Sequence, residues 1–275
     1  MALYKQLRIV AVIVSICLCM MINLDYLEKK SAIRLHLRGG VPVAPVGPMA
    51  PVPVAPATDP NVLLATDPNV LLFITTHFSD SHVKFMETCW PHTVSTVPLV
   101  QDADVLLYTS KDPPSSFLRL FRNITVQKYD NPGYQAGAIQ AVVDLEKHGW
   151  GDTYDWVIRV NPDVIIRNDT WLRKTMMNPE VDGIFTDCYS RTCEHHCSNQ
   201  LVHTDFFAFR PNAMVKGHFG SPTNKKDNAE RHATEAFQHI IKNGRDRWLP
   251  GSKQNGNCRV IHPDIIHEHS YLNEC

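Results

Sequence analysis

The sequence carries almost no net charge. Its 275 residues include 27 Lys and Arg against 28 Asp and Glu, which gives a formal charge of -1. A chain without an excess of positive charge has no overall field that attracts polyanions, so we expect no nucleic-acid partner. Hydrophobic residues make up 44% of the chain, enough to bury one substantial core. The expectation is therefore one globular domain.

The sequence also lacks an apolar run of the usual transmembrane length. The uncharged segment Ile9–Ile22 follows Lys5 and Arg8, but it is shorter than the ~20 residues that span a typical bilayer. A cleaved signal peptide and a signal anchor are both compatible with such a segment. No small-x-small cleavage site follows it, which favours the anchor. We predict a cytoplasmic tail over residues 1–8 and a signal-anchor transmembrane segment over residues 9–24.

Proline dominates the segment that follows. Residues 41–60 contain seven prolines in twenty positions, a composition that favours extended polyproline structure over packing into a core. We predict a Pro-rich stem over residues 25–68. The folded domain is then expected over residues 69–275, held away from the membrane by the stem.

Cysteine usage fits a lumenal domain. Six of the eight cysteines lie beyond the predicted anchor, an even number that is compatible with disulfides. Two sequons, at Asn123 and Asn168, suit the same compartment. We therefore expect a single-pass type II protein of the Golgi or ER membrane. The loop Cys188–Cys197 has three cysteines and two histidines, so it offers either a disulfide bridge or a tetrahedral zinc site.

Short apolar runs alternate with helical patterns through the domain. Val70–Thr75 and Ala103–Tyr108 have the composition of buried strands, whereas residues 81–90 and 134–148 have helical spacing of apolar side chains. A further helix is expected over residues 229–243. Alternation of this kind predicts an α/β domain with a mostly parallel, twisted sheet flanked by helices.

One predicted strand is interrupted by polar residues. Trp156–Val160 is apolar except for Arg159, and Asn161, Pro162 and Asp163 come before the second apolar run Val164–Ile166. Proline cannot donate a ladder hydrogen bond, so the chain must leave regular pairing here. One interpretation is an Asx-Pro turn that serves architecture alone. The other is a ligand site, because the carboxyl ends of strands in open α/β sheets carry binding groups.

The string WVIRVNPDVII resembles the metal-binding segment of GT-A-type nucleotide-sugar glycosyltransferases, in which an apolar strand leads into Asp-x-Asp and a second apolar run. Here Asn161 stands at the first Asp position. A later strand HTDFFAFRP, a helix entry HATEAF and a terminal HEH follow in the expected chain order. The resemblance implies a GT-A-like fold. It also implies transfer of a sugar from a nucleotide-sugar donor to a hydroxyl group of a glycan or glycoprotein acceptor.

The resemblance further implies a divalent cation, Mn²⁺ or Mg²⁺, bound to the donor diphosphate. Asp163 would bind this cation directly, and Asn161 would contact the cation or the donor ribose. A histidine of the terminal HEH, His267 or His269, would complete the coordination. The cation would neutralise the leaving diphosphate, where negative charge develops as the glycosyl bond breaks.

Three more residues receive roles by the same resemblance. Arg159, with Asn161 and Asp163, is a candidate for binding the donor. In an inverting reaction a carboxylate must accept the proton of the acceptor hydroxyl, and Asp205 or Glu235 is the candidate. The scattered histidines, including His77 and His82, belong to no motif and are interpreted as surface or core residues. A non-catalytic lumenal binding module, or a zinc-binding protein, is the alternative function.

Overall fold

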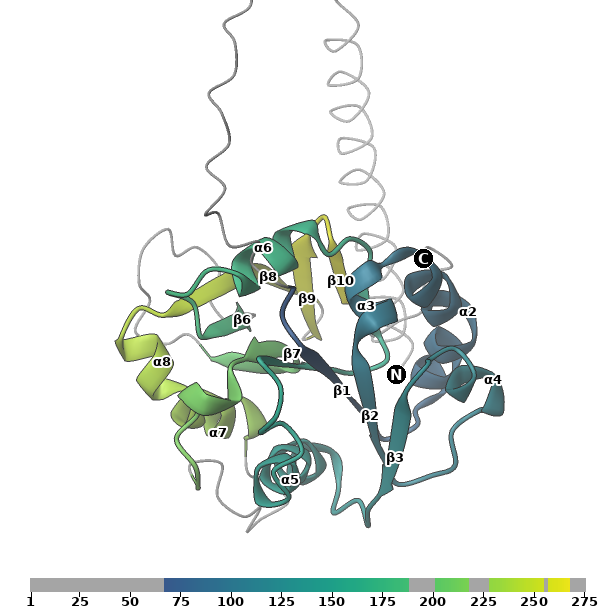
Figure 1. The fold of residues 1–275 in the computed structure, drawn as a ribbon. Coiled ribbons are helices and arrows are strands. Elements are labelled where there is room, and N and C mark those ends of the chain that lie inside the picture. Colours follow the sequence, from purple (N-terminus) through teal and green to yellow (C-terminus); the bar gives the residue numbers. More distant parts are fainter. Residues whose placement is uncertain (1–66, 188–200, 218–227, 255–256, 268–275) are drawn as a thin grey trace, which may run out of the picture. The chain divides into compact units, whose positions relative to one another are not determined.

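The computed structural model describes residues 67–187, 201–217, 228–254 and 257–267, all of which belong to one compact unit, Leu63–Cys275 (Figure 1). The strands are β1 (Val70–Thr76), β2 (Asp104–Thr109), β3 (Ile124–Lys128), β4 (Trp156–Val160), β5 (Val164–Ile166), β6 (Gly183–Asp187), β7 (Val202–Phe209), β8 (Asp246–Gln254), β9 (Asn257–His262) and β10 (Ile265–His267). The helices are α2 (Asp80–Thr96), α3 (Pro98–Asp102), α4 (Ser115–Leu118), α5 (Tyr134–Lys147), α6 (Thr170–Met176), α7 (Ala229–Ala236) and α8 (Gln238–Lys242), with a 3-10 turn η1 (Pro211–Ala213).

The strands form one sheet in the order β3-β2-β1-β4-β7-β6-β8-β9-β10-β5. The pairs β3-β2, β2-β1, β1-β4 and β6-β8 are parallel, and β7 runs antiparallel to both of its neighbours. From β3 to β8 the sheet is therefore mixed and mostly parallel. Beyond β8, the strands β9, β10 and β5 continue it in antiparallel pairing. This arrangement confirms the predicted α/β fold with a mostly parallel sheet.

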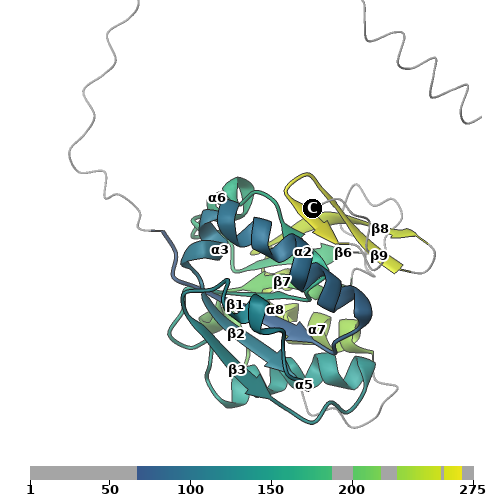
Figure 2. The same ribbon diagram turned by 90° about the vertical axis from the view of Figure 1, so that its right-hand side faces the viewer.

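Helices cover both faces of the sheet, because the central strands are apolar on both sides. Every residue of β1 and β4 is buried. Side chains of α2, α3, α4 and α6 join one hydrophobic cluster, which contains Leu72, Ile158 and Phe206. Side chains of α5, α7 and α8 join a second cluster, which contains Phe73 and Phe207. The two groups of helices lie on opposite sides of the sheet (Figure 2).

The predicted elements are mostly present, with shifted limits. The helix expected over residues 81–90 extends as α2 from Asp80 to Thr96, and its first turn is capped by the Ser79 hydroxyl. The helix expected over residues 229–243 is divided at Phe237 into α7 and α8. Strand β3, which alternates between half-buried and exposed residues at the sheet edge, was not predicted.

Several sequence predictions fall outside the described residues. The tail, the segment over residues 9–24 and the stem up to residue 66 are among them, as are His269 and the loop cysteines Cys188, Cys193 and Cys197. Within the part of the chain that the structure describes, no helix combines the length and the apolar character needed to cross a bilayer. Cys89, which is buried on α2, is disulfide-bonded.

Candidate active site

A polar pocket that is open to solvent lies at the carboxyl ends of β1 and β4. Thr75, Thr76 and His77 line it from the end of β1, and the amino-terminal turn of α5 lines another side. Arg159, Asn161 and Asp205 also line the pocket. The strands thus deliver polar groups to one edge of the sheet, as α/β folds do at their ligand sites.

Asn161 connects three strands through hydrogen bonds. Its side-chain oxygen accepts from the Thr75 hydroxyl at 2.9 Å, and its side-chain nitrogen donates to Oδ1 of Asp205 at 2.5 Å. Its backbone N–H also donates to the carbonyl of Asp205 at 2.9 Å. Asn161 therefore joins the ends of β1 and β4 to the middle of β7, where Asp205 lies.

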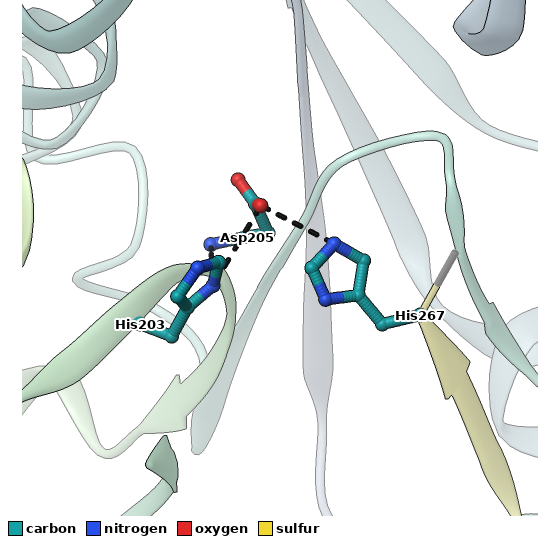
Figure 3. Close-up of side chains that lie close together, drawn as sticks. All are labelled: His203, Asp205 and His267. Carbon is teal, nitrogen blue, oxygen red and sulfur yellow. Dashed lines mark hydrogen bonds and ion pairs between the residues drawn. The ribbon is translucent and has the colours of Figure 1, made fainter. Parts of the chain in front are cut away.

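Asp205 is the carboxylate of a group that offers ligands for a cation. His203, Asp205 and His267 are buried, and each presents one ligand atom within 4.8 Å of the other two (Figure 3). Oδ2 of Asp205 lies 3.6 Å from Nδ1 of His203 and 3.2 Å from Nε2 of His267. Ligand atoms ~2.1 Å from one ion lie ~3 to ~4.2 Å apart, so the two separations from Asp205 are compatible with a shared cation.

The electrostatic surroundings keep Asp205 ionised. Burial by itself raises the pKa of its carboxyl group, but His203, His267 and Arg159 together hold that pKa well below the usual range. Nη1 of Arg159 lies 4.0 Å from Oδ1 of Asp205. An ionised carboxylate beside two imidazoles is a suitable ligand set for a divalent metal.

Asp163 occupies a different environment from Asp205. Its side chain is 2% exposed, and its Oδ2 lies 3.5 Å from Nε2 of the buried His82. The His82 ring in turn contacts the Thr76 hydroxyl at 3.0 Å through Nδ1. The structure therefore brings Asn161, Asp205 and His267 together and places the Asp163 carboxylate against α2.

The turn that carries Asn161 and Asp163 is itself well supported. The N–H of Val164 donates to the Asn161 carbonyl at 3.0 Å, and the Trp90 indole donates to the Pro162 carbonyl at 2.8 Å. The structure is therefore compatible with both interpretations of the interruption. The segment forms a tight turn, and it also presents a polar side chain to the pocket.

The two carboxylates of α7 differ in exposure. Glu235, a predicted proton acceptor, lies on the exposed side of the helix. Glu230, five residues earlier, is 6% exposed and accepts a 3.4 Å hydrogen bond from the hydroxyl of Thr204, which lines the pocket. Burial raises the pKa of Glu230, and the charge of Asp205 raises it further.

Sequence reasoning missed three residues near the pocket. His203 precedes Asp205 by two positions, so the short motif His-Thr-Asp on a predicted strand was an available signal. Glu230 lies five residues before Glu235, so the two side chains are on different faces of the helix, and only the helix phase distinguishes them. His77 lines the pocket from the end of β1, where a ligand site is expected.

Comparisons with known proteins give structural matches only. No family model matches the chain, and no curated protein matches it in sequence. Among solved structures, mannosyltransferase PcManGT from Pyrobaculum calidifontis, in complex with GDP-Man and Mn²⁺, is 16% identical with a TM-score of 0.42. That match covers 76% of this chain and 59% of the mannosyltransferase.

Two further structures match at a similar level. A putative nucleotide-diphospho-sugar transferase from Desulfovibrio desulfuricans G20 is 10% identical with a TM-score of 0.40, covering 66% of this chain and 80% of the other. S. aureus TarS 1-349, in complex with UDP-GlcNAc, is 12% identical with a TM-score of 0.43, covering 69% of this chain and 60% of the other. Similarity at this level identifies neither a substrate nor a reaction for this chain, whose chemistry must come from its own pocket.

Proposed function

We propose that this protein is a glycosyltransferase that moves a sugar from a nucleotide-sugar donor to a hydroxyl group of a glycan or glycoprotein, with a divalent cation at the donor diphosphate. The observation that carries the proposal is the group His203, Asp205 and His267 beside Asn161, at the carboxyl ends of a mostly parallel sheet. Such an edge is where α/β sheets bind nucleotides.

The residues that could bind the cation favour Mn²⁺ over Mg²⁺. His203 and His267 would hold the cation with the carboxylate of Asp205. Mg²⁺ prefers an all-oxygen environment and keeps several waters, whereas imidazole suits the later transition metals better. When bound, the cation would supply positive charge to the leaving diphosphate. Binding of the cation by Asp163 stays a prediction, since its carboxylate lies 3.5 Å from Nε2 of His82.

The chain also offers a group for the acceptor proton. In an inverting reaction the acceptor oxygen bonds to the anomeric carbon as the bond to the diphosphate breaks, and the hydroxyl proton passes to a base. Asp205 serves the cation in this proposal, and Glu235 is exposed. Glu230 is buried at the pocket side of α7, and its raised pKa makes its ionised form a stronger base.

We infer a lumenal location in the Golgi or ER, with residues 9–24 as a type II signal anchor. Support comes from the Pro-rich stem and from the two sequons, since Asn123 and Asn168 are both exposed in the folded domain. Expression in a secretory host followed by glycosidase digestion tests this placement. A mass shift that is lost in Asn123→Gln and Asn168→Gln is the expected outcome.

The test of activity is donor hydrolysis by the full-length chain. A panel of nucleotide sugars is incubated with Mn²⁺, with Mg²⁺ or with chelator, and release of the nucleoside diphosphate is measured. We expect cation-dependent hydrolysis of one donor class that falls by about 100-fold or more in Asp205→Asn. Asp112→Asn, which removes an 86% exposed carboxylate, is the matched control. No hydrolysis and no donor binding would contradict the proposal and favour a non-catalytic module.

The same three ligand residues also favour one second candidate function. Two histidines and one carboxylate are also the ligands of mononuclear non-haem iron sites. A metal-dependent oxidation would then replace glycosyl transfer. Tight Fe²⁺ binding in a chain that shows no affinity for nucleotide sugars would favour this candidate.

A further inference from the structure

Arg159 is a buried cation whose hydrogen-bonding capacity is largely unused. Its side chain is 2% exposed on β4, and its guanidinium carbon lies 5.8 Å from the centre of the Phe207 ring. Burial lowers the pKa of this guanidinium, although arginine stays protonated in proteins. Nε and Nη1 have no hydrogen-bond partner within the part of the chain that the structure describes. A buried N–H donor without a hydrogen-bond partner is unfavourable, so a ligand that accepts from it is favoured.

Asp205 does not satisfy these donors. The separation of 4.0 Å between Nη1 of Arg159 and Oδ1 of Asp205 exceeds hydrogen-bond length. That oxygen already accepts from the Asn161 amide at 2.5 Å, and the other oxygen faces His203 and His267. Asp205 thus balances the charge of Arg159 without occupying the fork of the guanidinium.

The amino terminus of α5 faces the same pocket. The helix has 14 residues, its N-cap Gly133 has no side chain to cap the first amides, and its first turn has no acidic residue. Gln135 and Gly137 of this helix line the pocket together with Arg159. The Gln135 side chain accepts from the N–H of Ala229 at 2.6 Å, so it serves the contact with α7. The free amides of a helix start carry partial positive charge and bind anions.

We propose that Arg159 and the amino-terminal turn of α5 form an oxyanion subsite in the pocket, which binds a phosphate or carboxylate group of the nucleotide-sugar donor independently of the cation. The inference rests on the proposed function for the identity of the ligand. The guanidinium fork fits either group in a bidentate manner. The two sources are the donor diphosphate and a carboxylate on the transferred sugar, which would make the donor an acidic sugar nucleotide.

The test uses the full-length chain in chelator, so that no cation contributes. Binding of inorganic pyrophosphate, of glucuronate and of neutral glucose is measured by calorimetry and by the shift in Tm. Wild type should bind one of the two anions and not glucose. Arg159→Gln should weaken that binding roughly ten- to a hundredfold, the equivalent of one or two charge-assisted hydrogen bonds. Arg122→Gln, which removes a charge that is 83% exposed, should leave it unchanged.

The results distinguish the two possible ligands of the subsite, and they test the subsite separately from the proposed function. Binding of pyrophosphate alone assigns the subsite to the diphosphate, and binding of glucuronate assigns it to an acidic sugar. If Arg159→Gln does not fold, Arg159→Lys is used in its place. This variant keeps the charge but loses the planar guanidinium group, and it should still weaken anion binding. Equal anion binding in wild type and both variants, or none in wild type, overturns the subsite. If the subsite is overturned but wild type still hydrolyses a nucleotide sugar, the proposed function stands. If anion binding depends on Arg159 but the chain neither binds nor hydrolyses a nucleotide sugar, the proposed function is wrong and the subsite stands.

Discussion

The pair Arg159 and Asp205 offers the sharpest test of how the pocket is held together. Both side chains are nearly inaccessible, at 2% and 9% exposed, and their closest charged atoms are 4.0 Å apart. Two unit charges at this distance interact by about 4 kcal/mol at an effective dielectric constant of 20. Removing one partner of a buried pair costs about 3 to 5 kcal/mol, because the remaining charge stays buried without its counter-charge.

A double-mutant cycle measures this interaction. Arg159→Met, Asp205→Asn and the double variant are unfolded in urea at neutral pH with chelator, and fluorescence of the buried Trp90 and Trp156 reports the transition. We expect each single variant to lose several kcal/mol in the free energy of unfolding. The double variant should lose about 2 to 4 kcal/mol less than the sum. Losses that add to within about 0.5 kcal/mol would refute the coupling and leave the histidines as the partners that balance Asp205.

Four further predictions concern single positions. His267→Gln should weaken Mn²⁺ binding at least ten- to a hundredfold in calorimetry, and unchanged affinity would remove this residue from the cation site. Glu230 has a folded-state pKa raised above 4.5 by burial, so the stability that depends on its protonation is lost as pH rises through that raised value. The free energy of unfolding of Glu230→Gln relative to wild type should therefore increase from pH 4 to pH 7, whereas a constant difference contradicts the shift. Asp163→Asn should lower the free energy of unfolding by about 1 to 3 kcal/mol, because the buried carboxylate faces His82, and urea titration with no loss would contradict this. Glu235→Ala should change stability by less than about 0.5 kcal/mol and leave donor hydrolysis intact, because the residue is exposed.

The fold was predictable where a strand is buried on both faces. β1 begins with five consecutive apolar residues and β4 is apolar except for Arg159, and such runs signal central strands. β3 has the sequence ITVQK, and none of its residues is fully buried, so its pattern is weak. Its strand conformation depends on pairing with β2, which a local pattern does not contain.

The site was predictable in its position but less so in its contacts. Asn161 and Asp163 do lie at a strand end, as the interruption indicated. Their side chains differ in surroundings because the turn at Pro162 breaks the alternation that would place residues two apart on one face. The contact of Asp163 with His82 spans two elements far apart in sequence, and a local motif carries no information about such a contact.

The hydrogen bonds of Asn161 determine which residue type the position accepts. The side chain accepts from Thr75 on one side and donates to Asp205 on the other, and a carboxamide does both whereas an ionised carboxylate cannot donate. An aspartate would bring two carboxylates to about hydrogen-bond distance, and one of them would have to hold a proton. The carboxylate next to Asn161 therefore belongs to Asp205 on the neighbouring antiparallel strand, and not to the turn itself.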